Sequence, residues 1–250
     1  MDINTALFSH LLPDMDPTPT PSNLRPFRDV PSLGPEEIVY ALSTSSNTSA
    51  PGPDQIPYRI WKEVNKANPS VLLALLGPLL KYGFHRASLK EANGIILSKP
   101  GQPDYSAPSL FLFIVLLQTV SKILERIIVS GLSHRARMVG LVKHNQCGFL
   151  PGLSMFAACA ALSQEVHTLQ RLALKASTLF LDINGGFDNI SYLVLTSLLR
   201  RKGIPHYLVS WVRSILTERK CQLVFQSSAN VFLPVRWVPH KVHLFLLYCS

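Results

Sequence analysis

One acidic residue of this chain stands where a metal-dependent reaction on a phosphate could take place. The apolar run 178–181 predicts a buried strand, and Asp182 follows it directly, with Gly185 and Gly186 just beyond. A carboxylate at the end of a buried strand can hold a hard cation such as Mg²⁺ next to a phosphate. A single acid does not complete such a site, so the partners of Asp182 decide what the segment can do.

Each candidate residue also has a structural explanation when it is taken alone. Asp182 is equally consistent with a helix-capping acid, and Asp188 is better explained as a cap for the next helix than as a metal ligand. Phe187 alone would be a core residue, and Lys99 alone would be a solvated loop lysine.

Histidines and cysteines offer no alternative site. The eight histidines show no ligand spacing, and we assign none of them a catalytic role. The cysteines have neither C-x-x-C spacing nor a matching histidine pair. We therefore expect buried free thiols of a reduced compartment, rather than a zinc site or disulfides, at Cys147, Cys159, Cys221 and Cys249.

Composition narrows the class of protein. A chain of 250 residues with 47% apolar content can bury a large core. The net charge of +9 favours a polyanionic partner, either nucleic acid or an acidic membrane surface, although the basic residues are scattered. The first residues lack the basic start of a secretory signal, and the longest uncharged apolar run, 110–120, is about half of the ~20 residues that a membrane span needs. We expect an intracellular protein with no transmembrane helix.

The elements that would position these residues alternate between helix and strand. Residues 1–34 contain six prolines and are expected to form an extended or disordered lead-in, while 35–250 form one mixed α/β (α+β) domain. The periodicity predicts helices at 35–42, 58–64, 71–84, 119–136, 154–172, 192–202 and 206–217. It predicts strands at 92–97 and 178–181, and a β-hairpin from 221–225 and 231–235.

Two of the helices carry clear apolar faces. In helix 119–136 the spacing turns Ile123, Leu124, Ile127 and Ile128 inward, and it turns outward three charged residues, Lys122, Glu125 and Arg126. In helix 154–172 the residues at helical spacing are Phe156, Cys159, Leu162, Val166 and Leu169.

Five short motifs in one order resemble a known family. They are A-P-G-P-D-Q-I-P at 50–57, S-K-P-G-Q-P-D-Y-S at 98–106, K-I-L-E at 122–125, N-Q-C-G-F at 145–149 and F-L-D-I-N-G-G-F-D-N-I at 180–190. From about residue 35 onward the chain resembles the reverse transcriptase domain of a non-LTR (LINE-type) retrotransposon. The resemblance implies right-hand polymerase fingers and a partial palm, with mixed helices and a small antiparallel sheet. It also implies an RNA template and a DNA primer as partners.

The resemblance assigns roles to particular residues. Asp182 would be the first metal-binding carboxylate of the palm, assisted by the backbone carbonyl of Ile183, with Mg²⁺ as the metal. Phe187 would stack beneath the incoming sugar, and Lys99 would lie in the finger hairpin near the template and the triphosphate. A loop would face the template through Asn145, Gln146, Gly148 and Gly152.

Departures from the family pattern argue against an active polymerase. The arginine expected to clamp the triphosphate is Leu112, and two further arginines are replaced by Leu150 and Leu153. The family's Y-x-D-D motif, which supplies the remaining metal-binding aspartates, does not occur in these 250 residues, nor does a thumb. One carboxylate of three cannot hold two Mg²⁺ ions in working geometry. The same losses explain the hydrophobicity of 110–120 as a product of decay.

Three hypotheses follow. The first is a truncated reverse transcriptase fragment without polymerase activity. The second is a non-catalytic, basic RNA- or DNA-binding protein on the same fold, which binds through salt-sensitive contacts. The third is an interaction or membrane-surface protein that uses the apolar run 110–120.

Overall fold

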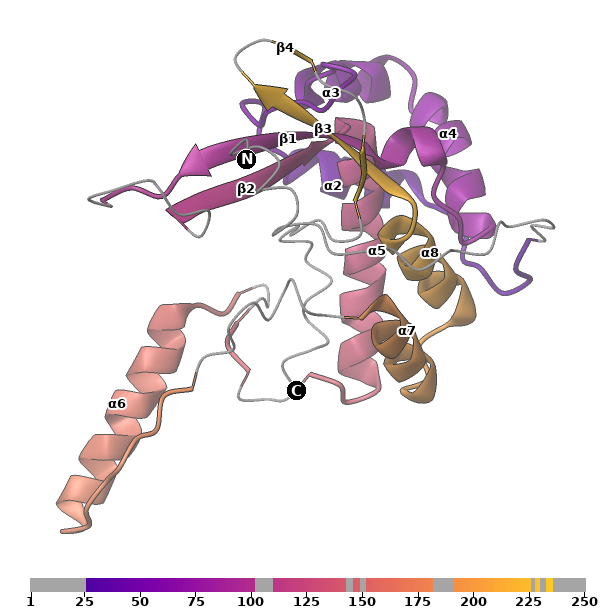
Figure 1. Cartoon of the computed structure of the whole chain (residues 1–250). Helices are drawn as coiled ribbons and strands as arrows, with labels where there is room; N and C mark the ends of the chain where they lie inside the picture. The colour runs from indigo at the N-terminus through magenta and orange to yellow at the C-terminus, as the bar shows by residue number, and fades with distance from the viewer. Residues whose placement is uncertain are drawn as a thin grey trace.

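A long central helix organises the fold in the computed structural model, which describes residues 26–101, 110–142, 146–148, 152–181, 191–225, 228–229 and 233–235. This helix is α5 (Thr119–Met138). Each of its predicted inward residues is at most 5% exposed, namely Ile123, Leu124, Ile127 and Ile128. Helices gather around α5 on one side of a small sheet (Figure 1). They are α2 (Pro35–Ser43), α3 (Tyr58–Ala67), α4 (Ser70–Lys81), α7 (Tyr192–Arg201) and α8 (His206–Leu216).

Local sequence explains where these helices begin and end. Pro35 occupies the first turn of α2, where a missing N–H costs nothing, and the Glu37 carboxylate accepts a 2.9 Å hydrogen bond from the Gly34 amide. Helix α7 is followed by Gly203, whose φ of +74° suits a glycine beyond a helix end. The helices predicted at these places are confirmed.

The sheet contains β1 (Glu91–Ser98), β2 (Phe111–Leu117), β3 (Arg219–Phe225), β4 (Ser228–Ala229) and β5 (Leu233–Val235). Strands β1 and β2 pair antiparallel, with Gly94 opposite Val115, and β3 pairs antiparallel with both β4 and β5. The mixed α+β class and the hairpin after residue 220 are therefore confirmed. The expectation of an antiparallel sheet is wrong at one place, because β1 and β3 run parallel, with Ala92 opposite Cys221. Their long connection through α5, α7 and α8 permits this, whereas a tight turn would not.

The apolar run after residue 110 is a strand of this sheet. Decay as the origin of its hydrophobicity stays a prediction, but the run has a structural role in the sheet. Val115 and Leu117 are at most 3% exposed, so this face of β2 belongs to the core. A continuous apolar run has no alternation to reveal its period, which is why the sequence pattern missed the strand.

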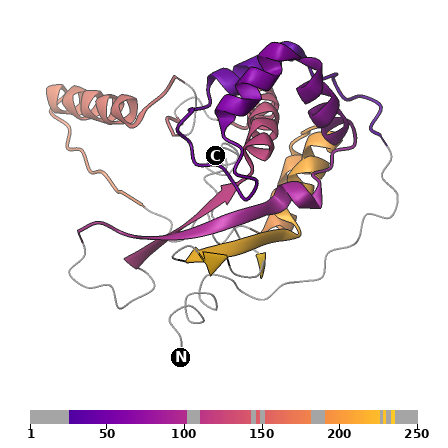
Figure 2. The same cartoon turned by 90° about the horizontal axis from the view of Figure 1, so that it is seen from above.

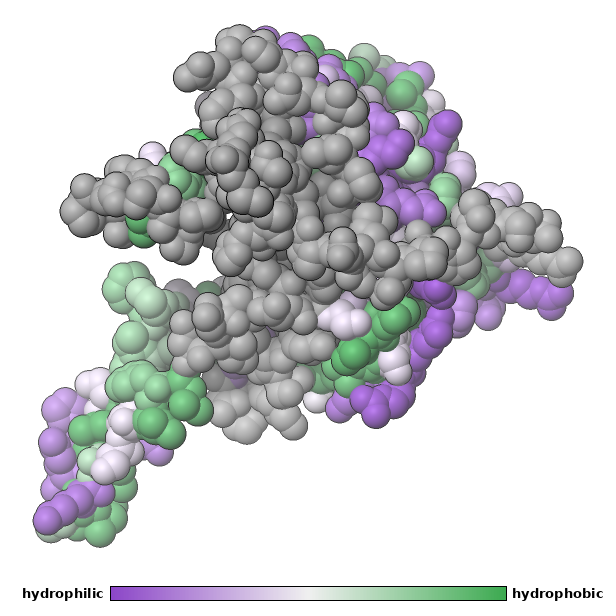
Figure 3. All heavy atoms as spheres, viewed as in Figure 1, coloured by the Kyte–Doolittle hydropathy of each residue, from purple (hydrophilic) through white to green (hydrophobic). Residues whose placement is uncertain are grey.

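Helix α6 (Met155–Arg171) forms where it was predicted, but it buries none of its residues. It begins at Ser154, whose hydroxyl accepts a hydrogen bond from the Ala157 amide, and it projects away from the helices around α5 (Figure 1). Apolar side chains lie on its visible surface (Figure 3), and Phe156 is 80% exposed.

The buried strand expected before Asp182 does not form in the described residues. Residues 178–181 have no regular structure, and Leu179, Phe180 and Leu181 are each at least 80% exposed. An apolar strand becomes buried only when another strand or helix covers it, and none of the described strands pairs with this run.

The cysteines differ from one another in burial. Cys221 in β3 is buried, as expected, but Cys159 on α6 is exposed and Cys147 is half-buried. Burial of the described thiols was therefore predicted correctly for Cys221 only.

Candidate functional site

The motif at 50–57 is a loop that lies against the start of α5. Gly52 is buried there, and a Cβ atom added to it would lie 2.4 Å from the amide nitrogen of Gln118 and 2.5 Å from the carbonyl carbon of Leu117. Backbone atoms cannot move aside as a flexible side chain can. The close approach of the two segments therefore requires glycine at position 52.

Side-chain hydrogen bonds fix the same contact. The hydroxyl of Thr119 donates to the carbonyl oxygen of Ile56 at 2.6 Å and accepts from the indole N–H of Trp61 at 2.9 Å. The ammonium of Lys122 donates to the carbonyl oxygen of Ala50 at 3.1 Å. Two of the five motifs, at 50–57 and 122–125, are thus held together although about 70 residues separate them.

Charged residues on α5 form hydrogen bonds and ring contacts with the segments packed against this helix. The Arg126 guanidinium donates to the carbonyl oxygen of Ala41 and to the hydroxyl of Ser45, and it lies 5.4 Å from the ring centre of Tyr58. Burial lowers the pKa of Lys122 and raises that of Asp54, which lies in the motif loop. Both residues therefore belong to the packed junction more than to the solvated surface.

Glu125 corrects our prediction of an outward-facing side chain. It is 9% exposed, and burial raises its pKa to about 6, against the opposing effects of Arg219, Lys122 and Arg126. The prediction assumed that α5 has one solvent-exposed face. The side chain is instead buried, and the buried residue Arg219 at the start of β3 is close enough to lower its pKa.

A second buried polar group, His85, was missed by sequence reasoning. His85 is fully buried, its Nε2 atom lies 2.8 Å from the hydroxyl of Ser121, and its amide donates to the hydroxyl of Ser214. Burial, followed by the positive charges of Arg219 and Lys90, lowers the pKa of His85 to about 3. The histidine is therefore neutral. No spacing in the sequence could reveal it, since its partners lie 36 and 129 residues away.

Two cations lie in the same region. Lys90 is 2% exposed, and its ammonium lies 3.9 Å from the carboxylate of Glu218. Burial lowers its pKa to about 8 although Glu218 opposes the shift. The Nε of Arg219 donates to the carbonyl oxygen of Ile215 at 2.6 Å. This cluster joins the helices to the sheet.

Lys99, predicted to face template and triphosphate, is placed on a projecting hairpin. It follows the end of β1, its amide donates to the carbonyl oxygen of Leu110 at 2.9 Å, and the residue is exposed. The β1–β2 hairpin reaches away from the helices (Figure 2). Gly101, with a φ of +78°, continues the turn beyond it.

The predicted template-side residues are described only in part. The side-chain amide of Gln146 donates to the carbonyl oxygen of Gly148 at 3.4 Å, and Gly152 has a φ of +81°. Asn145 lies outside the described residues, as do the three residues predicted to bind metal and nucleotide, Asp182, Ile183 and Phe187. Their roles stay predictions.

The described residues do not provide the metal site that the resemblance implies. Across the described ranges, no three histidine, cysteine or acidic side chains are grouped so that they could hold a metal ion. The same ranges contain no helix that is both long and apolar enough to cross a membrane.

The chain is similar to proteins described as probable RNA-directed DNA polymerases of transposons, in agreement with the resemblance of its motifs. It is 26% identical over 204 residues to a probable RNA-directed DNA polymerase from transposon BS of Drosophila melanogaster, and 23% identical over 196 residues to one from the transposon X-element of the same fly. It is 28% identical over 206 residues to a putative 115 kDa protein in the fly's type-1 retrotransposable element R1DM.

These matches cover 78–82% of the chain but only 19–21% of each relative, so the chain spans about a fifth of the length of the proteins it matches. No family model matches the sequence.

Proposed function

We propose that this chain forms the fingers and the beginning of the palm of a retrotransposon RNA-directed DNA polymerase, and that the 250-residue polypeptide binds RNA template and DNA primer without extending the primer. The observation that carries the proposal is the projecting β1–β2 hairpin with exposed Lys99 after its first strand. The similarity to RNA-directed DNA polymerases over about four fifths of the chain supports it.

The packing of the motifs supports a scaffold that presents this hairpin. Gly52, Thr119 and Lys122 fix the loop 50–57 against α5, and a single residue separates the end of β2 from the start of that helix. A hairpin attached to a packed joint keeps a defined orientation. A lysine on such a hairpin can contact phosphate as a point charge, and the net charge of +9 adds a sequence-independent attraction.

Loss of nucleotide addition is proposed on two observations. Leu112 stands where the family pattern has an arginine, and a leucine cannot donate to a phosphate oxygen. The segment 178–181 before Asp182 is exposed and pairs with none of the described strands, whereas the proposed metal site calls for a buried strand there. A family member would use a divalent metal, with Mg²⁺ as our expectation, at Asp182 and the Ile183 carbonyl.

Two assays test the proposal. In a filter-binding titration, we expect the affinity for RNA and for a primer–template duplex to fall as salt is added. The logarithm of the binding constant should fall linearly with the logarithm of the salt concentration. Lys99→Gln is expected to weaken binding more than the control Lys66→Gln does, because Lys66 is an exposed lysine on α3 rather than on the hairpin. Equal effects would remove the hairpin from the binding surface, and an absence of salt-dependent binding would overturn the binding function.

Primer extension on an RNA template with Mg²⁺ tests the second half of the proposal. We expect no incorporation of nucleotides by the 250-residue polypeptide. Incorporation that disappears in Asp182→Ala would show that the polypeptide is an active polymerase and that our assignment of inactivity is wrong.

A further inference from the structure

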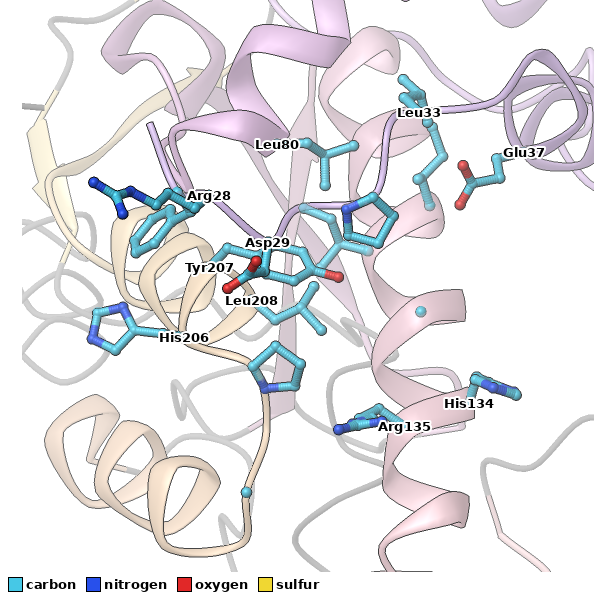
Figure 4. A pocket seen from close by; sticks show the side chains of 17 residues that line it. Arg28, Asp29, Leu33, Glu37, Leu80, His134, Arg135, His206, Tyr207 and Leu208 are labelled. Carbon is cyan, nitrogen blue, oxygen red and sulfur yellow. The ribbon is translucent and has the colours of Figure 1, made fainter. Parts of the chain in front are cut away.

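A cavity of about 680 Å³ lies on the helical side of the molecule, between the extended segment 26–34, α5 and the start of α8. Figure 4 shows its labelled side chains, with Arg28 and His206 on one side and, on α5, His134 and Arg135 on the other. Its volume is that of a typical small-ligand site. Neither the resemblance nor the proposed hairpin surface assigns a role to this cavity.

The wall formed by segment 26–34 is anchored by close contacts. The amide of Phe27 donates to the carbonyl oxygen of Lys81 at 3.0 Å, and the Phe27 ring lies 5.3 Å from the ring centre of His206. Gly83, with a φ of +55°, permits this packing, because a Cβ atom there would lie 2.8 Å from the Phe27 ring and 2.9 Å from the carbonyl oxygen of Tyr207. The cavity is therefore a built feature with an aromatic wall.

The lining combines an apolar surface with groups that can bind a base and a phosphate. Leu80, Ile127 and Leu208 supply apolar surface beside Phe27. Burial and the nearby Glu37 carboxylate raise the pKa of Tyr207, against the effect of Arg135, which indicates that this hydroxyl lies near both charges. The lining contains two acids, Asp29 and Glu37.

These charges decide which part of a ligand enters. Carboxylates repel a phosphate, but they accept hydrogen bonds from the amino groups of bases. Glu37 already accepts from the Gly34 amide, which leaves Asp29 as the acid with greater freedom to accept. Arg28 and Arg135 lie at opposite sides and are exposed, where the backbone of a strand that crosses the opening would pass.

Gly131, within α5, gives an independent reason to expect a ligand. A glycine inside a helix costs about 1 kcal/mol relative to alanine. A Cβ atom at Gly131 would meet nothing within 4 Å, so packing among the described residues does not require glycine there. Gly131 lines the cavity and leaves the helix backbone accessible from it.

We propose that this cavity binds one unpaired nucleotide of a single-stranded RNA, with the base against the Phe27 wall and the adjoining phosphates at Arg28 and Arg135. Stacking of bases on aromatic side chains, combined with basic groups along the strand, is the usual chemistry of single-strand binding. The inference rests on the proposed nucleic-acid-binding function and adds a second contact, away from the hairpin.

Fluorescence anisotropy with a short labelled single-stranded RNA tests the charges. We expect Arg28→Gln and Arg135→Gln each to weaken binding about three- to tenfold and to reduce the salt slope by about 0.7, the value for one phosphate contact on a single strand. Arg137→Gln is the matched control, because Arg137 is exposed on the same helix and does not line the cavity. We expect a change of less than about twofold in this control.

A filling variant tests the cavity itself. Gly131→Leu introduces a better helix former into open space, so circular dichroism and thermal unfolding should show an intact fold while RNA affinity falls about tenfold. Photocrosslinking of RNA that contains 4-thiouridine should label Phe27, His206 or Tyr207. If the wild type binds RNA but Gly131→Leu and Arg135→Gln bind equally well, the cavity assignment is wrong while the proposed function stands. If the wild type shows no salt-dependent RNA binding, the proposed function fails first.

Discussion

The Nε2 atom of His85 lies 2.8 Å from the hydroxyl oxygen of Ser121, and both residues are fully buried where the helices meet the sheet. His85 is also packed edge-on against Trp211, with ring centres 5.3 Å apart. Lys90 and Arg219 place positive charges nearby, and the carboxylate of Glu218 lies 3.9 Å from the ammonium of Lys90. A neutral imidazole suits this environment, and a second proton would be costly there.

We therefore predict that His85 makes the fold sensitive to acid. Its pKa is about 3 in the folded protein and about 6.5 when exposed, so the unfolded chain binds a proton first as pH falls. The free energy of unfolding should drop below pH 6.5 by up to about 1.4 kcal/mol per pH unit until pH approaches 3. Urea unfolding at about pH 7.5, 6.5 and 5.5 measures this slope.

Comparison of variants isolates the contribution of His85. Glu125 acts in the opposite sense, because its raised pKa favours the folded state as pH falls from about 6 towards 4.5. The slope of the wild type should therefore be compared with that of His85→Gln, which keeps Glu125. His134→Gln is the control, since His134 is exposed. A wild-type slope equal to that of His85→Gln would contradict the prediction.

Gly52 should not tolerate even one added methyl group. Gly52→Ala would press a Cβ atom against the backbone of Leu117 and Gln118, and we expect a loss of about 1–3 kcal/mol of stability. Gly77→Ala is the matched control, because Gly77 lies in α4 with nothing within 4 Å of its Cβ position. It should gain up to about 1 kcal/mol from helix propensity. Chemical unfolding of the two variants should show shifts of opposite sign, and equal shifts would rule out the close approach.

Loss of the Thr119 hydroxyl should lower the free energy of unfolding by more than the size of this group suggests. Thr119→Val keeps the shape of the side chain but leaves the carbonyl of Ile56 and the indole N–H of Trp61 without their partner. We expect a cost of about 1–3 kcal/mol in urea unfolding. Thr168→Val, which removes a hydroxyl bonded only within exposed α6, should cost less than about 0.5 kcal/mol. A similar cost for both variants would mean that the joint between the motifs is not a stabilising contact.

Helices could be predicted from this sequence because their apolar residues recur at a regular period. The inward residues of α5 are those expected, and Pro35 and Gly203 mark helix ends by their backbone preferences. The strand β2 could not be predicted in this way, because an unbroken apolar run fits several structures. For 178–181 the composition favoured a strand, but the described residues contain no partner to bury it.

Only those residues of the candidate site that belong to a recognisable motif could be predicted from the sequence. The motif 50–57 could be recognised in the sequence, yet its contact with Thr119 and Lys122 depends on tertiary packing that no local spacing encodes. The burial of His85 and the cavity beside Phe27 likewise arise from segments far apart in the sequence. Motif order indicates the function, whereas these contacts exist only in the folded chain.

The cysteines provide a test of the fold that does not depend on function. Cys159 is exposed on α6, whereas Cys221 is 1% exposed in β3, where burial raises the pKa of its thiol to about 12. Because the thiolate is the reactive form, we expect iodoacetamide near neutral pH to modify Cys159 readily and Cys221 only after unfolding. Peptide mass spectrometry at increasing urea concentration measures both sites in one sample. Rapid modification of Cys221 in the folded protein would contradict the packing of β3 beside β1, and Cys159→Ser confirms the assignment of the fast reaction.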